Sequence, residues 1–166
     1  MSPRRVLWLV PVLLAVHNAE EALFFPRYLP LVLARLPAGW QAVAAPLTTG
    51  QVWSALAVVT GVAFAIAWWA HRRPDSRAAL WLLLLIQCAV LLNVAWHVVA
   101  AVVLFGGYAP GLVTALVLNL PFSLYLLRRA IRERWLSHPA TWALVPGAIL
   151  LHGPLLAALL LLTERL

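Results

Sequence analysis

The first long apolar run of the chain reads VLWLVPVLLAVHNAEEALFF, residues 6–25. A helix of about 20 mostly apolar residues is long enough to cross the hydrocarbon core of a bilayer. This run nevertheless contains His17, Glu20 and Glu21, and its two glutamates are among only five acidic residues in the chain. An ionisable group at membrane depth costs roughly 3 kcal/mol on insertion scales, so its default interpretation is functional. The run therefore predicts both a membrane-spanning helix and a polar site inside it.

The composition is that of an integral membrane protein. The 166 residues are 64% hydrophobic and 10% charged, which is more apolar side chain than a soluble domain of this size can bury. The twelve basic residues are all arginine, and the formal net charge is +7. These arginines fall in short clusters between apolar runs, which indicates membrane topology rather than nucleic-acid binding. With a single cysteine, Cys88, no internal disulfide can form.

Five segments are long and apolar enough to span a membrane, so the expected fold is all-α, with one bundle of five transmembrane helices in a single domain, residues 1–166. Pro26 is expected to end the first span, and Pro30 and Pro37 to interrupt the helix that would follow. Pro46 is expected to open the second span. No small-residue cleavage site follows the first run, so we expect a retained helix rather than a signal peptide. The expected spans are residues 6–25, 47–70, 78–105, 110–128 and 139–162.

The distribution of arginine predicts the orientation. Five spans place the N-terminus and the loops 71–77 and 128–138 on one side, which holds nine arginines. The other side holds only Arg27, Arg35 and Arg165. The positive-inside rule then predicts a cytoplasmic N-terminus and an external C-terminus. We expect an integral protein of a bacterial-type plasma membrane.

Polar residues of the other spans recur at the depth of the motif. With a rise of about 1.5 Å per residue, most of these residues lie roughly 14–23 Å from the cytoplasmic face, and His97 lies one helical turn further out than Asn93. Polar groups gathered at one depth on several helices indicate a pocket rather than scattered contacts between helices. Two tryptophans are candidates for lining the same pocket. The residues expected to bind a substrate are Asn93, His97, Asn119, His152, Trp53 and Trp96.

The motif itself favours acid/base chemistry. His17 lies one helical turn from both glutamates, so an imidazole and at least one carboxyl group share a helix face. Two adjacent carboxyl groups in a low-dielectric site do not both ionise, which leaves a proton to transfer. We therefore expect His17, Glu20 and Glu21 to be the catalytic residues of an isomerase or cyclase that needs no cofactor and acts on an apolar, isoprenoid- or polyketide-like substrate from the bilayer. Adjacent residues point about 100° apart on a helix, so the sequence leaves open which glutamate acts.

Two alternatives remain open at this stage. In the first, the protein is a metalloenzyme, because His17, Glu21, His97 and His152 offer the nitrogen and oxygen ligands that zinc and iron use. In the second, it is a lipid-binding or assembly subunit, which needs the pocket but not the acid.

The stretch His17-Asn18-Ala19-Glu20-Glu21 resembles the signature of the HXXEE-domain family of small membrane proteins. The later segments 93–97, 108–111 and Thr114 are similar to downstream segments of that family, so the resemblance covers most of the chain. The family itself does not imply a reaction. The layout of five helices with buried histidine and glutamate also resembles the emopamil-binding (EXPERA) sterol isomerases and the small membrane terpene cyclases. That second resemblance is architectural, and it implies protonation of an alkene or epoxide by an intramembrane acid.

Overall fold

The computed structural model describes residues 3–35 and 47–162, and every regular element in these two ranges is a helix. Pro37, Pro46 and Arg165 lie outside the described residues. Five helical segments are long and apolar enough to cross a membrane, which confirms the predicted all-α fold with five such helices. These segments are Arg5–Arg35, Thr49–Arg72, Arg77–Phe105, Leu112–Arg132 and His138–Leu160.

Several of the segments consist of more than one element, because short π-helical turns, labelled η, or a single residue in a turn, Trp8 or Ala143, interrupt the α-helices. The first three segments contain α1 (Pro3–Leu7), α2 (Leu9–Arg35), α4 (Thr49–Arg72), α5 (Arg77–Val99) and η1 (Ala100–Phe105). The last two contain α6 (Leu112–Thr114), η2 (Ala115–Asn119), α7 (Leu120–Arg132), α8 (His138–Trp142), α9 (Leu144–Leu150), η3 (Leu151–Leu155) and α10 (Leu156–Leu162).

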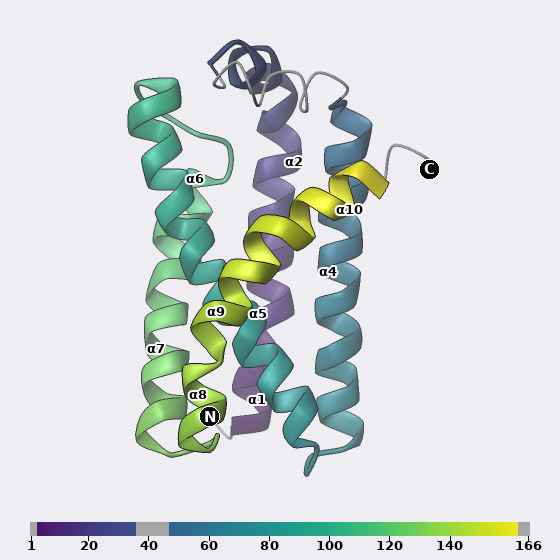
Figure 1. Ribbon diagram of the computed structural model, residues 1–166, viewed down its shortest axis with the longest axis vertical. Coiled ribbons are helices and arrows are strands. Elements are labelled where there is room, and N and C mark those ends of the chain that lie inside the picture. The colour runs from purple at the N-terminus through teal and green to yellow at the C-terminus, as the bar shows by residue number, and fades with distance from the viewer. Residues whose placement is uncertain (1–2, 36–46, 163–166) are drawn as a thin grey trace.

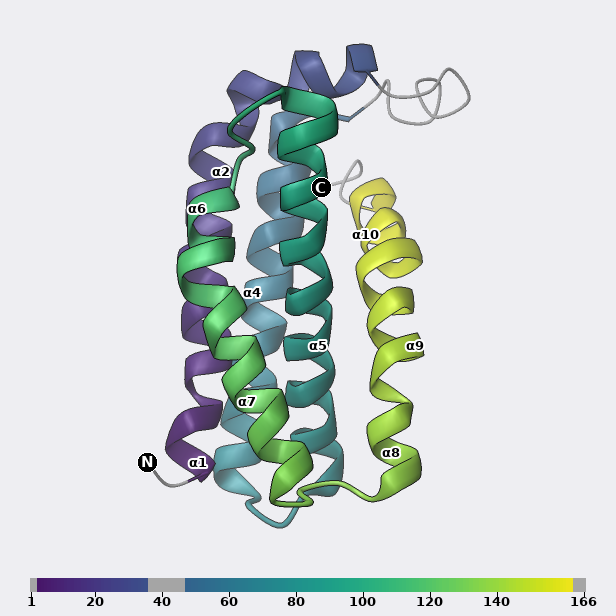
Figure 2. The ribbon, with the colours of Figure 1, turned by 90° about the vertical axis from the view of Figure 1, so that its left-hand side faces the viewer.

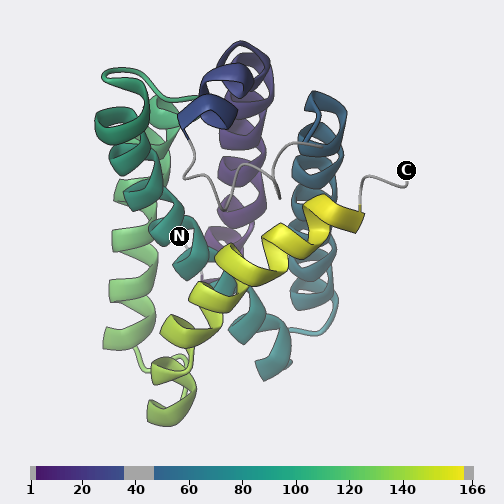
Figure 3. The ribbon, with the colours of Figure 1, turned by 45° about the horizontal axis from the view of Figure 1, so that its top comes forward.

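The helices form an elongated bundle. Figure 1 shows α2, α4 and α7 extending along the long axis, with α5 inclined to it and α10 passing obliquely in front of α2 toward α4. Figure 2 shows that α8, α9 and α10 stand as a separate layer on one side of the others. Within that layer α9 packs on α5, and α10 reaches α4, as the oblique path in Figure 3 indicates. The last segment therefore covers a face that α4 and α5 share.

The first helix does not end where the sequence predicts. Pro26 and Pro30 both lie inside α2, which continues to Arg35, so the expected end at Pro26 is wrong. A proline removes one backbone hydrogen bond and crowds the preceding turn, which can kink a helix without ending it. Figure 2 shows α2 bending across the top of the bundle at its C-terminal end. Within a membrane the helix remains the best way to satisfy the remaining backbone groups, so a kink is favoured over a break.

Local signals explain the other helix ends. Thr48 and Gln51 form a reciprocal capping box at the start of α4, and the Ser76 side chain accepts a hydrogen bond from Ala79 N–H at the start of α5. Gly106 ends the third segment with a left-handed φ of 65°, which glycine adopts without a steric penalty. The loop that follows, residues 106–111, leads back toward α2.

The main apolar core occupies the half of the bundle nearest the loops at residues 73–76 and 133–137. Leu83, Leu84 and Leu126 are fully buried there, packed against the first turns of the first segment. A fully buried polar contact joins α5 to α7 in this core, where Gln87 Nε2 donates to Ser123 Oγ at 2.6 Å. Most of the other buried polar side chains lie toward the opposite half, around His17.

Candidate functional site

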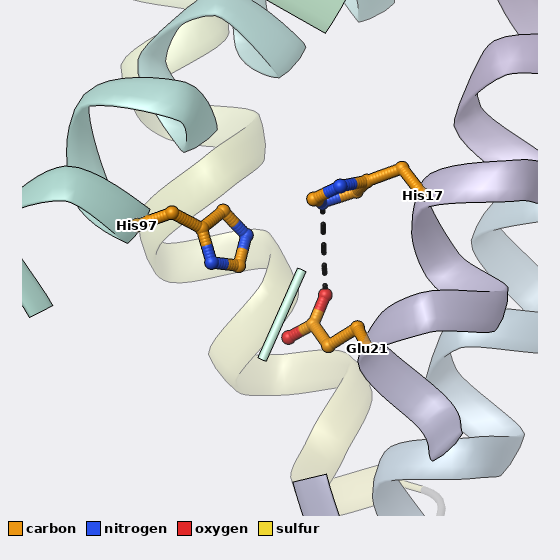
Figure 4. A group of neighbouring side chains, drawn as sticks. All are labelled: His17, Glu21 and His97. Atoms are coloured by element: carbon orange, nitrogen blue, oxygen red, sulfur yellow. Dashed lines mark ion pairs between the residues drawn. The ribbon is translucent and has the colours of Figure 1, made fainter. Parts of the chain in front are cut away.

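The centre of the site is built by two pairs of residues, each pair spaced one helical turn apart. His17 and Glu21 lie at i, i+4 on α2, and Asn93 and His97 lie at i, i+4 on α5. Figure 4 shows His97 pointing from α5 toward the space where His17 and Glu21 converge from α2. The His17 and His97 rings meet edge to face with their centroids 4.9 Å apart. His17 Nε2 lies 3.9 Å from Glu21 Oε2.

A continuous hydrogen-bond chain fixes both imidazole rings. Asn93 Nδ2 lies 2.9 Å from His17 Nε2 and 3.0 Å from His97 Nε2. With the amide nitrogen assigned to this position, Asn93 donates one proton to each ring, so both Nε2 atoms act as acceptors. His17 Nδ1 then carries the proton and donates to Thr114 Oγ1 at 2.9 Å, and the Thr114 hydroxyl donates to the Gly111 carbonyl. These hydrogen bonds keep the His17 imidazole neutral and in a single tautomer.

The two glutamates of the motif have different surroundings. The Glu20 carboxylate accepts from Tyr108 OH at 2.6 Å, from Thr114 N–H at 2.7 Å and from Val113 N–H at 3.2 Å. These three donors attach α2 to the loop 106–111 and to the start of the fourth segment. Burial and the bond to Glu20 both raise the pKa of Tyr108, so its hydroxyl remains a donor. Glu20 therefore holds α2 against this loop and the start of the fourth segment.

Gly111 lets this loop approach the two imidazole rings. Its φ is +82°, and a Cβ atom placed there would lie 2.9 Å from Cε1 of both His17 and His97. A side chain at this position would be strained in its backbone and would collide with both rings. The glycine is therefore required by geometry as well as by conformation.

Glu21 faces a pocket of about 330 Å³ between α2, α4, α5 and the last segment. Four polar side chains line it, namely Asn18, Glu21, Asn93 and His152, and the other lining residues are apolar. Asn18 Nδ2 donates to Thr60 Oγ1 at 2.8 Å and so joins α2 to α4 at the pocket wall. Among the residues that the structure describes, neither Glu20 nor Glu21 has an arginine partner.

The structure brings together most, but not all, of the residues expected from sequence to form the site. Asn119 is buried in η2, and its amide atoms have no hydrogen-bond partner among the described residues. Trp53 is 51% exposed and donates to the Ala22 carbonyl, and Trp96 is 52% exposed. None of these three side chains lines the pocket.

Four residues that take part in the site are absent from the sequence-based prediction: Asn18, Tyr108, Gly111 and Thr114. Asn18 lies between the predicted catalytic residues, so its position in the motif is a usable signal. Thr114 is the first polar side chain of the fourth span and also carries a signal. Tyr108 and Gly111 belong to the loop 106–111, which contacts α2 only in the folded protein. No local sequence pattern predicts this contact, and only the resemblance of the segment 108–111 to the family indicated these two residues.

Three side chains are also arranged as a metal site requires. The potential ligand atoms, one from each residue, lie within 4.8 Å of one another in the group His17, Glu21 and His97. His152 does not belong to this group. Two imidazoles and a carboxylate are a donor set that zinc and non-haem iron both use. The lone pairs of both Nε2 atoms are directed at the Asn93 amide. The set therefore fits a metal only if Asn93 turns its amide oxygen toward it or moves aside.

Comparison with known proteins gives a family but no activity. The sequence profile of a family described as "Protein of unknown function with HXXEE motif" matches residues 8–126. The chain is 27% identical over 147 residues to a Bacillus subtilis (strain 168) protein named "Uncharacterized protein YrkK", with 89% of this chain and 85% of that protein covered. No solved structure matches the chain significantly.

Proposed function

Since the chain belongs to the family of proteins with the HXXEE motif, whose description carries no activity, we propose from its site that it is an intramembrane enzyme. It transfers a proton to an apolar, isoprenoid- or polyketide-like substrate in an isomerisation or cyclisation. The observation that carries the proposal is the difference in surroundings between the adjacent carboxyl groups of Glu20 and Glu21. Glu20 accepts hydrogen bonds from three donors, whereas Glu21 accepts none among the described residues and lines an apolar pocket next to His17.

Glu21 is the proton donor in this proposal. Its carboxylic acid forms a C–H bond at one carbon of an alkene and leaves a positive charge on the neighbouring carbon. Loss of a proton from an adjacent carbon to the Glu21 carboxylate then forms a new double bond and restores the acid, so an isomerisation is balanced without a cofactor. His17 Nε2 lies 3.9 Å from Glu21 Oε2, and because this nitrogen is an acceptor it favours the protonated form of the Glu21 carboxyl group, which is the form that donates. Asn93 holds the imidazole in place.

The test compares Glu21→Gln with wild type in proteoliposomes. A panel of isoprenoid alkenes and epoxides is offered in D₂O, and products are identified by mass spectrometry with their deuterium content. Removing a positioned general acid lowers turnover by about 10²-fold or more. Glu133→Gln is the matched control, because Glu133 is exposed in the loop after α7 and contacts its sequence neighbours Arg129, Arg132 and Trp135, away from the pocket. Full turnover by a folded Glu21→Gln variant contradicts the proposal and favours the alternative of a lipid-binding subunit.

A second candidate function is metal-dependent catalysis, favoured by the three converging donor atoms of His17, Glu21 and His97. Elemental analysis of the purified protein and titration with Co²⁺, followed by its visible absorption, test it directly. One equivalent of metal that is lost in His97→Ala and retained in His138→Ala supports metal binding. Absence of stoichiometric metal, together with unchanged Co²⁺ absorption, excludes it and leaves the metal-free acid.

We also propose that the N-terminus is cytoplasmic, that the C-terminus is external and that the membrane is of the bacterial plasma type. Nine of the twelve arginines lie at the N-terminus and in the two loops that share its side. In this orientation the apolar core is near the cytoplasm and the His17 centre lies in the outer half of the membrane.

A further inference from the structure

Two polar side chains of the pocket have no hydrogen-bond partner among the described residues, Glu21 on α2 and His152 on the last segment. Asn18 donates to Thr60 and Asn93 lies between the two imidazoles, whereas Glu21, the proton donor of the proposed function, comes no nearer to His17 Nε2 than 3.9 Å. The His152 ring also lines the pocket, but it makes no hydrogen bond or ion pair with any residue that the structure describes. It is therefore free to contact whatever fills the pocket.

The local structure of the last segment places this imidazole. His152 lies in the π-helical turn Leu151–Leu155, which contains Pro154. Such turns reorient side chains and recur at functional sites. The other lining residues of this segment are all leucines, so His152 is a lone polar group on an apolar wall. These leucines are Leu151, Leu155, Leu156 and Leu159.

An unpaired polar group in an apolar pocket discriminates between ligands. A ligand that supplies a hydrogen-bonding oxygen satisfies the imidazole, whereas a hydrocarbon of the same length removes its water and supplies no partner. Sites built around a hydrogen bond reject analogues that lack the bonding group much more strongly than apolar pockets reject extra methylene groups. The rest of the wall is apolar and favours a long hydrocarbon body.

We propose that the ligand of this pocket is a lipophile with one oxygen-bearing group, a hydroxyl or a carbonyl, and that His152 binds this oxygen. The inference rests on the proposed function only in taking the pocket as the substrate site. It narrows the proposed class of apolar substrates to those that carry one hydroxyl or carbonyl group. The oxygen is held by η3, and the apolar body extends past Glu21 on α2.

The test uses 1-dodecanol and n-dodecane as matched probes. Each is added at equal mole fraction in detergent micelles to purified full-length protein, and apparent affinity is obtained from the rise in Tm followed by tryptophan fluorescence. Wild type should bind 1-dodecanol about tenfold more tightly than n-dodecane. His152→Phe should lose this preference, and His152→Gln, which keeps a hydrogen-bonding group, should retain part of it. His138→Phe controls for the loss of a histidine, because His138 is exposed and paired with Trp142.

Equal responses of wild type to the two probes, including no response to either, overturn the inference. So does a His152→Phe variant that keeps the wild-type preference. The two proposals fail separately, because the inference is tested by the probe preference of wild type and His152→Phe, whereas the proposed function is tested by the turnover of Glu21→Gln. If the wild-type pocket prefers 1-dodecanol but the Glu21→Gln variant keeps full turnover, the inference about binding is supported and the proposed function is not.

Discussion

At the scale of single residues, the site depends on the unequal surroundings of two adjacent glutamates. Glu20 joins α2 to the loop 106–111 and to the fourth segment through three donors. Replacing it with glutamine removes the charge from these bonds and directs an amide group at backbone N–H donors. We expect Glu20→Gln to lower the free energy of unfolding by about 1.5–3 kcal/mol, the range for hydrogen bonds to charged groups.

The measurement is equilibrium unfolding in mixed micelles, with Glu133→Gln as the exposed control. Tyr108→Phe removes one of the three donors and should cost less, about 1 kcal/mol. A Glu20→Gln variant as stable as Glu133→Gln would show that Glu20 does not hold the loop.

Gly111 gives a second prediction at this scale. In Gly111→Ala the backbone must keep φ near +82° while the new Cβ lies 2.9 Å from both imidazole rings. We expect a loss of about 2 kcal/mol or more from backbone strain alone, together with displacement of His17 or His97. Gly107→Ala is the matched control, because a Cβ there meets nothing within 4 Å. Histidine NMR spectra that are unchanged in Gly111→Ala would contradict this account.

The sequence predicts the depth of site residues better than the direction in which they point. The spacing of His17 in its span and of Asn93 and His97 in theirs gives a common depth, and the structure joins these three by hydrogen bonds. Depth alone also selects Asn119 and Trp53, but depth does not say which way a helix is rotated. The difference between Glu20 and Glu21 depends on donors that are 88 to 94 residues away in sequence, in the loop 106–111 and in α6, which no local pattern shows.

At the scale of elements, prolines are ambiguous in an apolar helix. In water, Pro26 and Pro30 would be good signals for a helix end, because water can satisfy the freed backbone groups. In a bilayer the unpaired groups favour continuation, so the same residues kink α2 instead. Capping residues such as Thr48 and Ser76, which act at the ends of the spans, keep their usual meaning.

The contact between α5 and α7 gives a prediction for a pair of elements. Gln87 and Ser123 are 2% and 0% exposed and bond to each other at 2.6 Å. Ser123→Ala alone leaves the Gln87 amide without this partner and should cost about 1–3 kcal/mol. The double variant Gln87→Leu with Ser123→Ala removes both polar groups and should cost less than the sum of the two single changes. Additive losses in this double-mutant cycle would show that the bond does not couple the helices.

At the scale of the whole molecule, the number of spanning helices follows from composition and run length, but their arrangement does not. The five runs are separated by clear loops, so the spans agree within a few residues except at the end of α2. The oblique path of the last segment, which gives the pocket a wall containing His152, depends on packing of α9 on α5 and of α10 on α4. Apolar side chains that face lipid and those that face another helix look alike in sequence, so this packing could not be predicted.

The orientation of the molecule is a prediction that depends on the whole chain. Nine arginines lie on the N-terminal side of the five spans and three on the other side. The positive-inside rule therefore favours a cytoplasmic N-terminus. Cysteine labelling tests this orientation. Cys88, the only cysteine of the sequence, is first replaced by alanine. A single cysteine is then introduced at one of two exposed loop positions, as Asp75→Cys or as Gly107→Cys. A membrane-impermeant maleimide should label Gly107→Cys in intact spheroplasts and Asp75→Cys only after lysis. The reverse pattern would place the His17 centre in the cytoplasmic half of the membrane, and substrates would then have to reach the pocket from the inner leaflet.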